Sequence, residues 1–230
     1  INENKQPYDD NGHGTHVAGT IAAVNNGTGM VGVAPKTKIV PVKALDKKGG
    51  GSTHVIARAV EWAVSRRVDF ITMSLGSGGM DAGLKQAIDY AEQMNVVVFC
   101  AAGNSGPNVD IMYPARFNNT ISIGAVNDRF DRTKFSCSGE SLDFMAPGLN
   151  IFSTVPNNRY AIMSGTSMSN PFATGCASLL LSYNKRHHKY NLRTYRDYVD
   201  FFKKHTIQVS NPAHRTKRYQ GYGIMNLKLI

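Results

Sequence analysis

Two short segments hold side chains that could carry out nucleophilic chemistry. Ser167 lies in GTSMS (165–169), directly before a run of helix-forming residues, and His13 begins HGTHVAGT (13–20), another such run. The free N–H groups and the dipole at the start of a helix favour negative charge, so a serine there is well placed to act as a nucleophile. Either residue alone is also explained without function, because a serine at a helix start is most often only a cap.

The spacing around these residues argues against two other kinds of site. GTSMS is not the G-x-S-x-G elbow of α/β-hydrolases, since its fifth position is Ser169. His13 and His16 are three residues apart, whereas zinc helices of the H-E-x-x-H type need four, and no Cys or Glu cluster completes a metal site. We expect His16 to point into the helix as a hydrogen-bonded structural residue, and His13, between two glycines, to be accessible.

A third candidate is Asn104 in AAGNSG (101–106), where Gly103 and Gly106 flank it. Asn and Gly favour turns, so a turn alone would explain this segment. The alternative is that the side-chain amide donates a hydrogen bond to an oxyanion. Each signal is weak by itself, and their combination carries the functional interpretation.

The elements that must position these residues follow from the spacing of apolar side chains. Strand-like segments lie at 37–45, 68–75, 96–102, 120–126 and 142–147, and helical patterns begin at His13, Thr53, Leu84 and Ser167, with a last helix around 193–204. Thr53 is expected to cap the second helix, and Pro171 to lie in the first turn of the helix that begins at Ser167.

Apolar strands that alternate with helices predict an α/β fold with a mostly parallel sheet covered by helices on both faces. The carboxyl ends of such strands meet at one edge of the sheet, where ligands bind. The loops SLGSGG (74–79) and AAGNSG follow two of the predicted strands. We therefore expect these loops near one site.

Composition limits the class of protein. The chain has 230 residues, 42% hydrophobic and 18% charged, which suits one globular domain over 1–230, and it has no run of about 18 apolar residues that would span a membrane. Cys100, Cys137 and Cys176 make an odd count, and we expect free thiols. Free thiols favour a cytoplasmic location, with secretion as the alternative.

The net charge of +10 is concentrated at the carboxyl end. Residues 185–230 contain 11 Lys and Arg against 2 Asp and Glu. A nucleic-acid partner is possible on charge alone, but no recognised motif supports it, and a solvated basic surface is the simpler interpretation. We expect no nucleic-acid and no membrane partner, and the sequence leaves the oligomeric state open.

The segments HGTHVAGTIAA, GVAP, MSLG, AAGN, APG and SGTSMSNP, in this order, resemble the subtilisin-like serine proteases, or subtilases. The resemblance covers essentially the whole chain and ends in GYGIMNLKLI (221–230), with FCAAGN (99–104) closest to the intracellular bacterial branch. It implies a subtilisin-like three-layer fold. Two positions depart from the family: Asn170 replaces a small residue, and Phe172 replaces a histidine.

The resemblance implies a role for each candidate. His13 would be the general base and Ser167 the nucleophile, with Asn104 and the backbone N–H of Ser167 as the oxyanion hole. An extended peptide substrate would lie between two strand edges. The residues implied for these edges are Ser74, Leu75, Gly76 and Gly103 on one side and Gly49, Gly50 and Gly51 on the other.

A serine protease also needs an acid that orients the histidine. In subtilisins the chain order is Asp, His, Ser, and the Asp ends a strand well before the His. Asp9 and Asp10 are too close to His13 to come from a separate strand, and Asp10 is expected to be a helix-start residue. We therefore expect the triad Asp, and the first strands of the sheet, upstream of Ile1.

The segment AAVNNGTGMVGVAP (22–35) resembles the calcium-binding loop of the family. The resemblance implies that Asn26 gives a side-chain oxygen to Ca²⁺, and that Val24, Thr28 and Met30 give backbone carbonyls. The remaining ligands, a carboxylate among them, would lie upstream. Without the resemblance, the same residues would be read as a turn.

Taken together, the residues and the resemblance predict a serine endopeptidase that cleaves extended or unfolded polypeptides through an acyl-enzyme on Ser167. The chain 1–230 alone is expected to be nearly inactive, because the acid is not in it. The alternative is a subtilase relic that binds peptides in the same groove without cleaving them.

Overall fold

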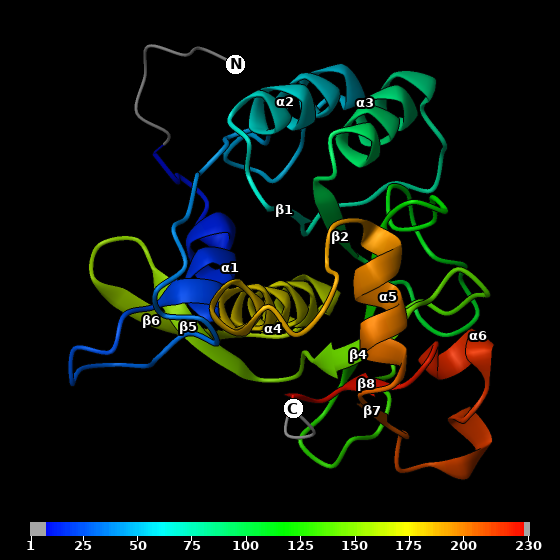
Figure 1. The fold of residues 1–230 in the computed structure, drawn as a ribbon. Helices are drawn as coiled ribbons and strands as arrows, with labels where there is room; N and C mark the ends of the chain where they lie inside the picture. The colour runs from blue at the N-terminus through cyan, green and yellow to red at the C-terminus, as the bar shows by residue number, and fades with distance from the viewer. Residues whose placement is uncertain (1–7, 228–230) are drawn as a thin grey trace.

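A computed structural model describes residues 8–227 (Figure 1). The elements follow in the order α1 (His13–Ala22), α2 (Thr53–Ser65), β1 (Phe70–Met73), α3 (Ala82–Gln93), β2 (Val97–Ala101), β3 (Ile121–Val126), β4 (Phe144–Pro147), β5 (Ile151–Val155), β6 (Arg159–Met163), α4 (Thr166–His187), α5 (Tyr195–Lys203), β7 (Thr206–Ile207), the 3₁₀ turn η1 (Pro212–His214), α6 (Lys217–Gln220) and β8 (Ile224–Met225). The mixed α/β class predicted from the sequence is confirmed.

The main sheet has the strand order β1-β2-β3-β4-β8-β7. In this order, β1, β2, β3, β4 and β8 each run parallel to their neighbours. The short β7 at the end of the sheet is antiparallel to β8. Phe70 pairs with Val97, and Phe99 pairs with Ile121. Because β1 and β2 are parallel neighbours, the loops that follow them leave the same edge of the sheet, as the sequence predicts.

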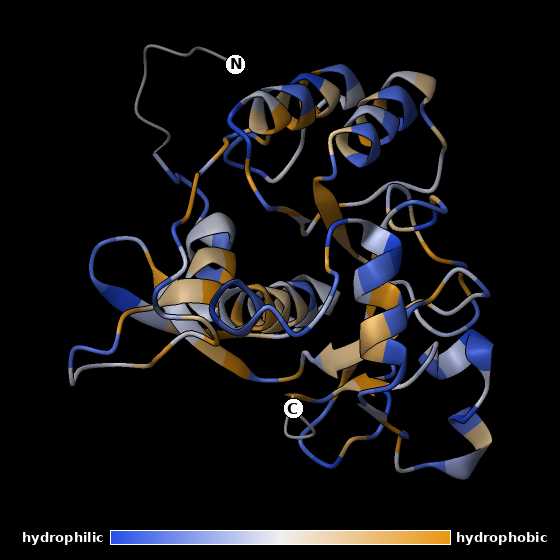
Figure 2. Cartoon of the chain, viewed as in Figure 1, coloured by the Kyte–Doolittle hydropathy of each residue, from blue (hydrophilic) through white to orange (hydrophobic). Residues whose placement is uncertain are grey.

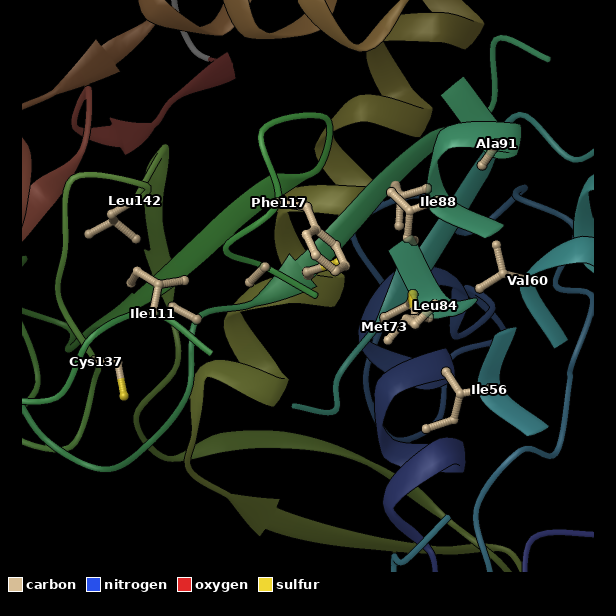
Figure 3. Packing of buried hydrophobic residues seen from close by; sticks show 14 of the residues in the cluster. Ile56, Val60, Met73, Leu84, Ile88, Ala91, Ile111, Phe117, Cys137 and Leu142 are labelled. Carbon is tan, nitrogen blue, oxygen red and sulfur yellow. The ribbon is translucent and has the colours of Figure 1, made fainter. Parts of the chain in front are cut away.

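Helices cover both faces of the sheet, because the buried strands alternate their side chains between two cores. On β2, Val98 and Cys100 pack with α2 and α3, whereas Val97 and Phe99 pack with α4 and α5. Figure 3 shows the first of these cores, where Ile56 and Val60 of α2 lie near Leu84, Ile88 and Ala91 of α3 and Met73 of β1. Figure 2 shows hydrophobic colours along β2, and both hydrophobic and hydrophilic colours on the covering helices.

The starts of α2 and α3 have short polar caps, which satisfy backbone N–H groups that lack a partner within the helix. The Ser52 side chain accepts from the N–H of Val55 at the start of α2, and Asp81 accepts from Leu84 at the start of α3. The prediction that Thr53 caps α2 is wrong. Thr53 is the first helical residue, and its hydroxyl donates to Asp81 at 2.7 Å, which joins the starts of the two helices.

The prediction of a strand at 37–45 is wrong. These residues are in no strand and in no named helix, and Ile39 and Val40 are 40% and 45% exposed. An apolar segment becomes a strand only when a neighbouring strand pairs with it, and Pro41 also removes one donor from any ladder. Within the described sheet, β1 pairs with β2 alone, so β1 forms an open edge.

The hairpin of β5 and β6 was not predicted, although its sequence carries a signal. Phe152 pairs with Ile162, and Asn157 and Asn158 in the turn have positive φ angles of 66° and 55°, a conformation that Asn tolerates. The hairpin packs against α1, where Ser153 donates to the His16 carbonyl at 2.8 Å. It therefore holds the helix that carries His13.

Helix α4 begins one residue earlier than predicted, at Thr166, and Pro171 lies inside the helix rather than in its first turn. The three cysteines are free and buried, as predicted. Within residues 8–227, no helix has the length and apolar character that a bilayer crossing requires.

Candidate active site

The start of α4 holds Ser167 as the second residue of the helix, half-buried at the surface. The N–H groups of Met168 and Ser169 lie 3.0 and 3.4 Å from the carbonyl oxygen of Gly165, and these bonds close the first turn. The N–H of Thr166 points instead to Asn104. Because these first N–H groups lie at the positive end of the helix dipole, the hydroxyl of Ser167 lies where developing negative charge is favoured.

Thr166 connects this helix start to the loop after β2. Its hydroxyl and its N–H both lie 2.9 Å from Asn104 Oδ1, and the N–H of Gly103 donates to the same hydroxyl at 3.2 Å. Thr166 is fully buried, so these bonds are shielded from water. With its oxygen held by Thr166, the Asn104 amide is oriented with Nδ2 as its free donor group.

Two hydrogen-bond donors flank one point beside Gly165. The position that a Cβ on Gly165 would take lies 3.3 Å from Asn104 Nδ2 and 3.7 Å from the backbone nitrogen of Ser167. Glycine leaves this space free for another atom. Asn104 Oδ1 lies 3.7 Å from the same point, so the whole Asn104 amide borders this space.

Ser74, at the end of β1, contacts Ser167 twice. Its hydroxyl donates to the carbonyl oxygen of Ser167 at 2.9 Å, and the hydroxyl of Ser167 lies 3.5 Å from the carbonyl oxygen of Ser74. The structure therefore brings together the ends of β1 and β2 and the start of α4, as the sheet topology predicts.

His13 is the first residue of α1, which packs directly against α4. Burial lowers the pKa of His13, the nearby His16 lowers it further, and Asp9 opposes both effects. A neutral imidazole is therefore favoured near pH 7, which is the form that accepts a proton. Within residues 8–227, the ring nitrogens of His13 have no hydrogen-bond partner, neither Ser167 nor a carboxylate.

The acids nearest to His13 are used elsewhere. Asp9 accepts hydrogen bonds from the N–H groups of Gly12 and Thr15, at 2.8 and 2.7 Å, and from the Thr15 hydroxyl at 2.6 Å. Asp10 instead forms a surface ion pair with Lys43. The prediction that Asp10 starts the helix is therefore wrong, because Asp9 has this role. Glu3, the other acid before His13, lies outside the described residues.

His16 is a structural residue, as predicted. It is fully buried, and its Nε2 lies 3.0 and 3.2 Å from the carbonyl oxygens of Ile151 and Ala161 in the hairpin. Burial lowers its pKa, and the two carbonyls oppose this effect. A buried neutral ring therefore fixes α1 to the hairpin, one turn away from His13.

The residues implied for substrate binding lie in three places in the fold. Gly103 lies at the network described above, and Gly76 approaches Met112, which a Cβ on Gly76 would reach at 3.0 Å. Gly49 and Gly50 lie in a separate exposed turn, where Gly50 donates to Asp46 Oδ1 at 2.9 Å. Leu75 packs at the edge of the α2–α3 core, and the remaining glycine, Gly51, follows the exposed turn.

The residues implied for calcium line one groove of about 360 Å³, together with Ile39 and Tyr160: these are Val24, Asn26, Thr28 and Met30. Asn26 Oδ1 accepts from the N–H and the hydroxyl of Thr28, at 3.2 and 3.0 Å. Residues 8–227 contain no group of three or more His, Cys, Asp or Glu side chains that could hold a metal. These oxygens suit Ca²⁺ in type, but they lack the carboxylate and the number of ligands that Ca²⁺ needs.

The basic carboxyl end has some internal charge partners. Lys185 pairs with Asp69 at 3.1 Å, and Lys203 pairs with Asp200 at 3.3 Å. Five basic residues in or directly after the last turn of α4 also interact favourably with the helix dipole: Lys185, Arg186, His187, His188 and Lys189. These ion pairs and the helix dipole stabilise some of the positive charges of residues 185–230 without an anionic partner.

Sequence reasoning missed two contributions to the site. Thr166 was not singled out, although a hydroxyl directly before the candidate nucleophile is a signal that could have found it. Ser74 was assigned to the substrate through its backbone, whereas its side chain bonds the Ser167 carbonyl. That contact needs the packing of β1 against α4, which no local pattern encodes.

Comparisons with known proteins identify the family to which the chain is similar. The sequence profile of the subtilase family matches residues 1–223. Subtilisin DY of Bacillus licheniformis is 45% identical over 177 residues, which cover 76% of this chain and 65% of that protein. Subtilisin of Bacillus pumilus is 47% identical over 180 residues, which cover 76% of this chain and 66% of that protein. Subtilisin E of Bacillus subtilis (strain 168) is also 47% identical over 180 residues, which cover 76% of this chain and 47% of that protein. The matched region therefore spans less than two thirds of these relatives.

The hydrogen bonds to Asp9 predict a pH-dependent contribution to stability. Partial burial alone would raise the pKa of Asp9, but its bonds from Thr15, Gly12 and Asn11 lower the pKa from 3.8 to about 2. Ionised Asp9 therefore stabilises the fold above about pH 3.8, and this contribution is lost as the pH falls through about 2. We expect Asp9→Ala to lower the free energy of unfolding at pH 7 by about 1 kcal/mol.

Urea unfolding of the wild type and of Asp9→Ala between pH 7 and pH 2 tests this. The difference between the two proteins is expected to shrink at the acid end of the range. Asp10→Ala is the control, because it removes an exposed ion pair worth less than about 1 kcal/mol. An Asp9→Ala deficit that stays the same at pH 2 would contradict the assignment.

Proposed function

The chain belongs to the subtilase family, and we propose that it is a serine endopeptidase that cleaves extended or unfolded polypeptides through an acyl-enzyme on Ser167. The observation that carries this proposal is the meeting of Ser167, Asn104 and the end of β1 at one edge of the sheet. The similarity to subtilisins supports it, since the family profile matches residues 1–223 and the relatives are 45–47% identical to this chain.

In the proposed reaction, the Ser167 hydroxyl oxygen attacks the peptide carbonyl carbon while its proton passes to His13. Negative charge then develops on the former carbonyl oxygen, where Asn104 Nδ2 and the N–H of Ser167 donate to it. His13 returns the proton to the leaving amine as the C–N bond breaks, and water releases the acyl group by the same steps. Removing such an amide donor costs about 10²–10³ in turnover, a magnitude measured in a subtilisin, a relative of this chain.

We propose that the acid that orients His13 comes from a strand outside residues 1–230. Three observations support this: Asp9 and Asp10 are committed to other partners, β1 has an open edge, and 37–45 is apolar but unpaired. In this proposal, an additional strand would form hydrogen bonds with the open edge of β1 on one side and with residues 37–45 on the other. Without an orienting carboxylate, turnover falls by about 10⁴, a value measured in serine proteases including a subtilisin, so 1–230 alone would be nearly inactive.

The second candidate function is a peptide-binding protein without catalysis. It is favoured by one observation, that within the described residues His13 has no carboxylate partner. The same open strand edges would then bind an extended peptide by β-augmentation. Both candidates take polypeptide as the ligand, and they differ in whether Ser167 reacts.

Chemical labelling of Ser167 distinguishes the two functions. We expect a serine-directed fluorophosphonate to form one covalent adduct on Ser167 in the folded protein, slowly in 1–230, because the helix start and His13 activate the hydroxyl. Intact-mass spectrometry followed by peptide mapping measures the adduct. Ser167→Ala is the control and is expected to remain unlabelled. A folded wild type without adduct, which still binds an unstructured peptide, would replace the enzyme with the binding protein.

We also propose a structural Ca²⁺ at the groove around Asn26, completed by ligands from outside residues 1–230. Binding to the folded state alone would stabilise the fold by about 2.7 kcal/mol at a Ca²⁺ concentration 100 times the Kd. We therefore expect added Ca²⁺ to raise the Tm of a chain that carries the upstream residues, and EDTA to reverse this. Asn26→Ala is expected to abolish the shift. A Tm that is independent of Ca²⁺ would remove these residues from the ligand set.

A further inference from the structure

Pro171 creates a defect in α4 at the carbonyl of Ser167. In an unbroken helix, the N–H of residue 171 would donate to the carbonyl oxygen of residue 167. Proline has no N–H, and its ring also pushes this carbonyl away from the helix axis. The defect therefore falls on the candidate nucleophile itself, whose carbonyl needs another donor.

Ser74 supplies that donor from a different element. Its hydroxyl lies 2.9 Å from the carbonyl oxygen of Ser167, at the carboxyl end of β1. The bond joins a residue of the sheet edge to one 93 positions later. It replaces the missing helical bond with one whose direction is set by β1, so the position of the sheet fixes the peptide plane after Ser167.

Asn170 is a polar neighbour of the Ser74 hydroxyl that favours its direction toward Ser167. Asn170 is fully buried, and its Nδ2 lies 3.4 Å from Ser74 Oγ, 2.9 Å from Thr72 Oγ1 and 3.3 Å from the carbonyl oxygen of Phe99. An NH₂ group can only donate, and it has two protons for these three acceptors, so its contact with Ser74, the longest of the three, makes no demand on the Ser74 proton. The single hydroxyl proton of Ser74 is then left for the carbonyl of Ser167.

We propose that Ser74, oriented by Asn170, is a positioning residue that fixes the backbone of Ser167 for attack. This rests on the proposed function, because it concerns the rate at which Ser167 reacts. The Ser74 side chain acts through Ser167 and does not itself need to touch substrate. Small displacements of reacting atoms have large effects on rate, since a shift of about 1 Å can cost about 100-fold.

The first test compares the rates at which a fluorophosphonate modifies Ser167 in four proteins. Relative to wild type, Ser74→Ala is expected to lower the limiting first-order rate about tenfold or more without weakening reversible binding of the probe. Ser74→Thr keeps a hydroxyl and should stay within about twofold. Ser178→Ala is the matched control, since it removes another hydroxyl-to-carbonyl bond of α4, 3.0 Å long and remote from Ser167. Equal rates in wild type and Ser74→Ala would overturn the proposal.

The second test does not depend on catalysis. Amide hydrogen exchange at Met168 and Ser169, whose N–H groups bond to Gly165, is expected to speed up about tenfold in Ser74→Ala and to stay unchanged in Ser178→Ala. Exchange in the buried part of α4 around Leu180 should stay the same in both. If wild type is never labelled, the proposed function fails, and unchanged exchange at Met168 and Ser169 separately overturns the role of Ser74.

Discussion

The site depends on one buried hydroxyl, that of Thr166. It accepts from Gly103 at the end of β2 and donates to Asn104, while the N–H of the same residue holds the same amide oxygen. Because Thr166 is fully buried, no water can replace these bonds, and breaking them would leave polar groups unsatisfied. The start of α4 is therefore tied to the sheet edge, and the reactive hydroxyl one residue later inherits that position. A parallel sheet makes this possible, since it brings the ends of β1 and β2 to one edge (Figure 1).

The histidine is held by a second set of contacts, in addition to the packing of α1 against α4. Helix α1 is fixed to the β5–β6 hairpin through the buried ring of His16, and its first turn is closed by Asp9. This explains why the acids next to His13 in sequence do not serve it: Asp9 already accepts several hydrogen bonds at the helix start, and a second role would cost some of them. In the proposed arrangement the orienting carboxylate approaches from the open edge of β1, which pairs with β2 alone within the described sheet. The strand proposed above would pair this open edge and would also bring an acid to His13.

Most of the sheet could be predicted from the sequence, because the buried strands β2, β3 and β4 are made mainly of apolar residues. The strand at 37–45 failed because apolar character shows only that a segment can pair, and the partner is absent from the described residues. The predicted cap of α2 was off by one residue, at Thr53 instead of Ser52, and Pro171 lies a few residues deeper in α4 than predicted. Both errors arise because the sequence signals for helix ends are weaker than the periodicity of apolar residues. Ser167, Asn104 and His13 were found as residue types in suitable local positions. The hydrogen bonds of Thr166 and Ser74 could not be predicted in this way, because each bond joins segments more than 60 residues apart.

The central claim is that Ser167 and His13 form a nucleophile and base that need an acid from outside residues 1–230. The most direct measurement is the hydrolysis of an unstructured protein by 1–230 and by the chain produced from the start codon of its gene, each beside its Ser167→Ala form. The account predicts cleavage that depends on Ser167 in both, with the rate of 1–230 lower by about 10⁴. Cleavage by 1–230 alone at the rate of the longer chain would contradict it, and would make Asp9 or Asp10 the acid.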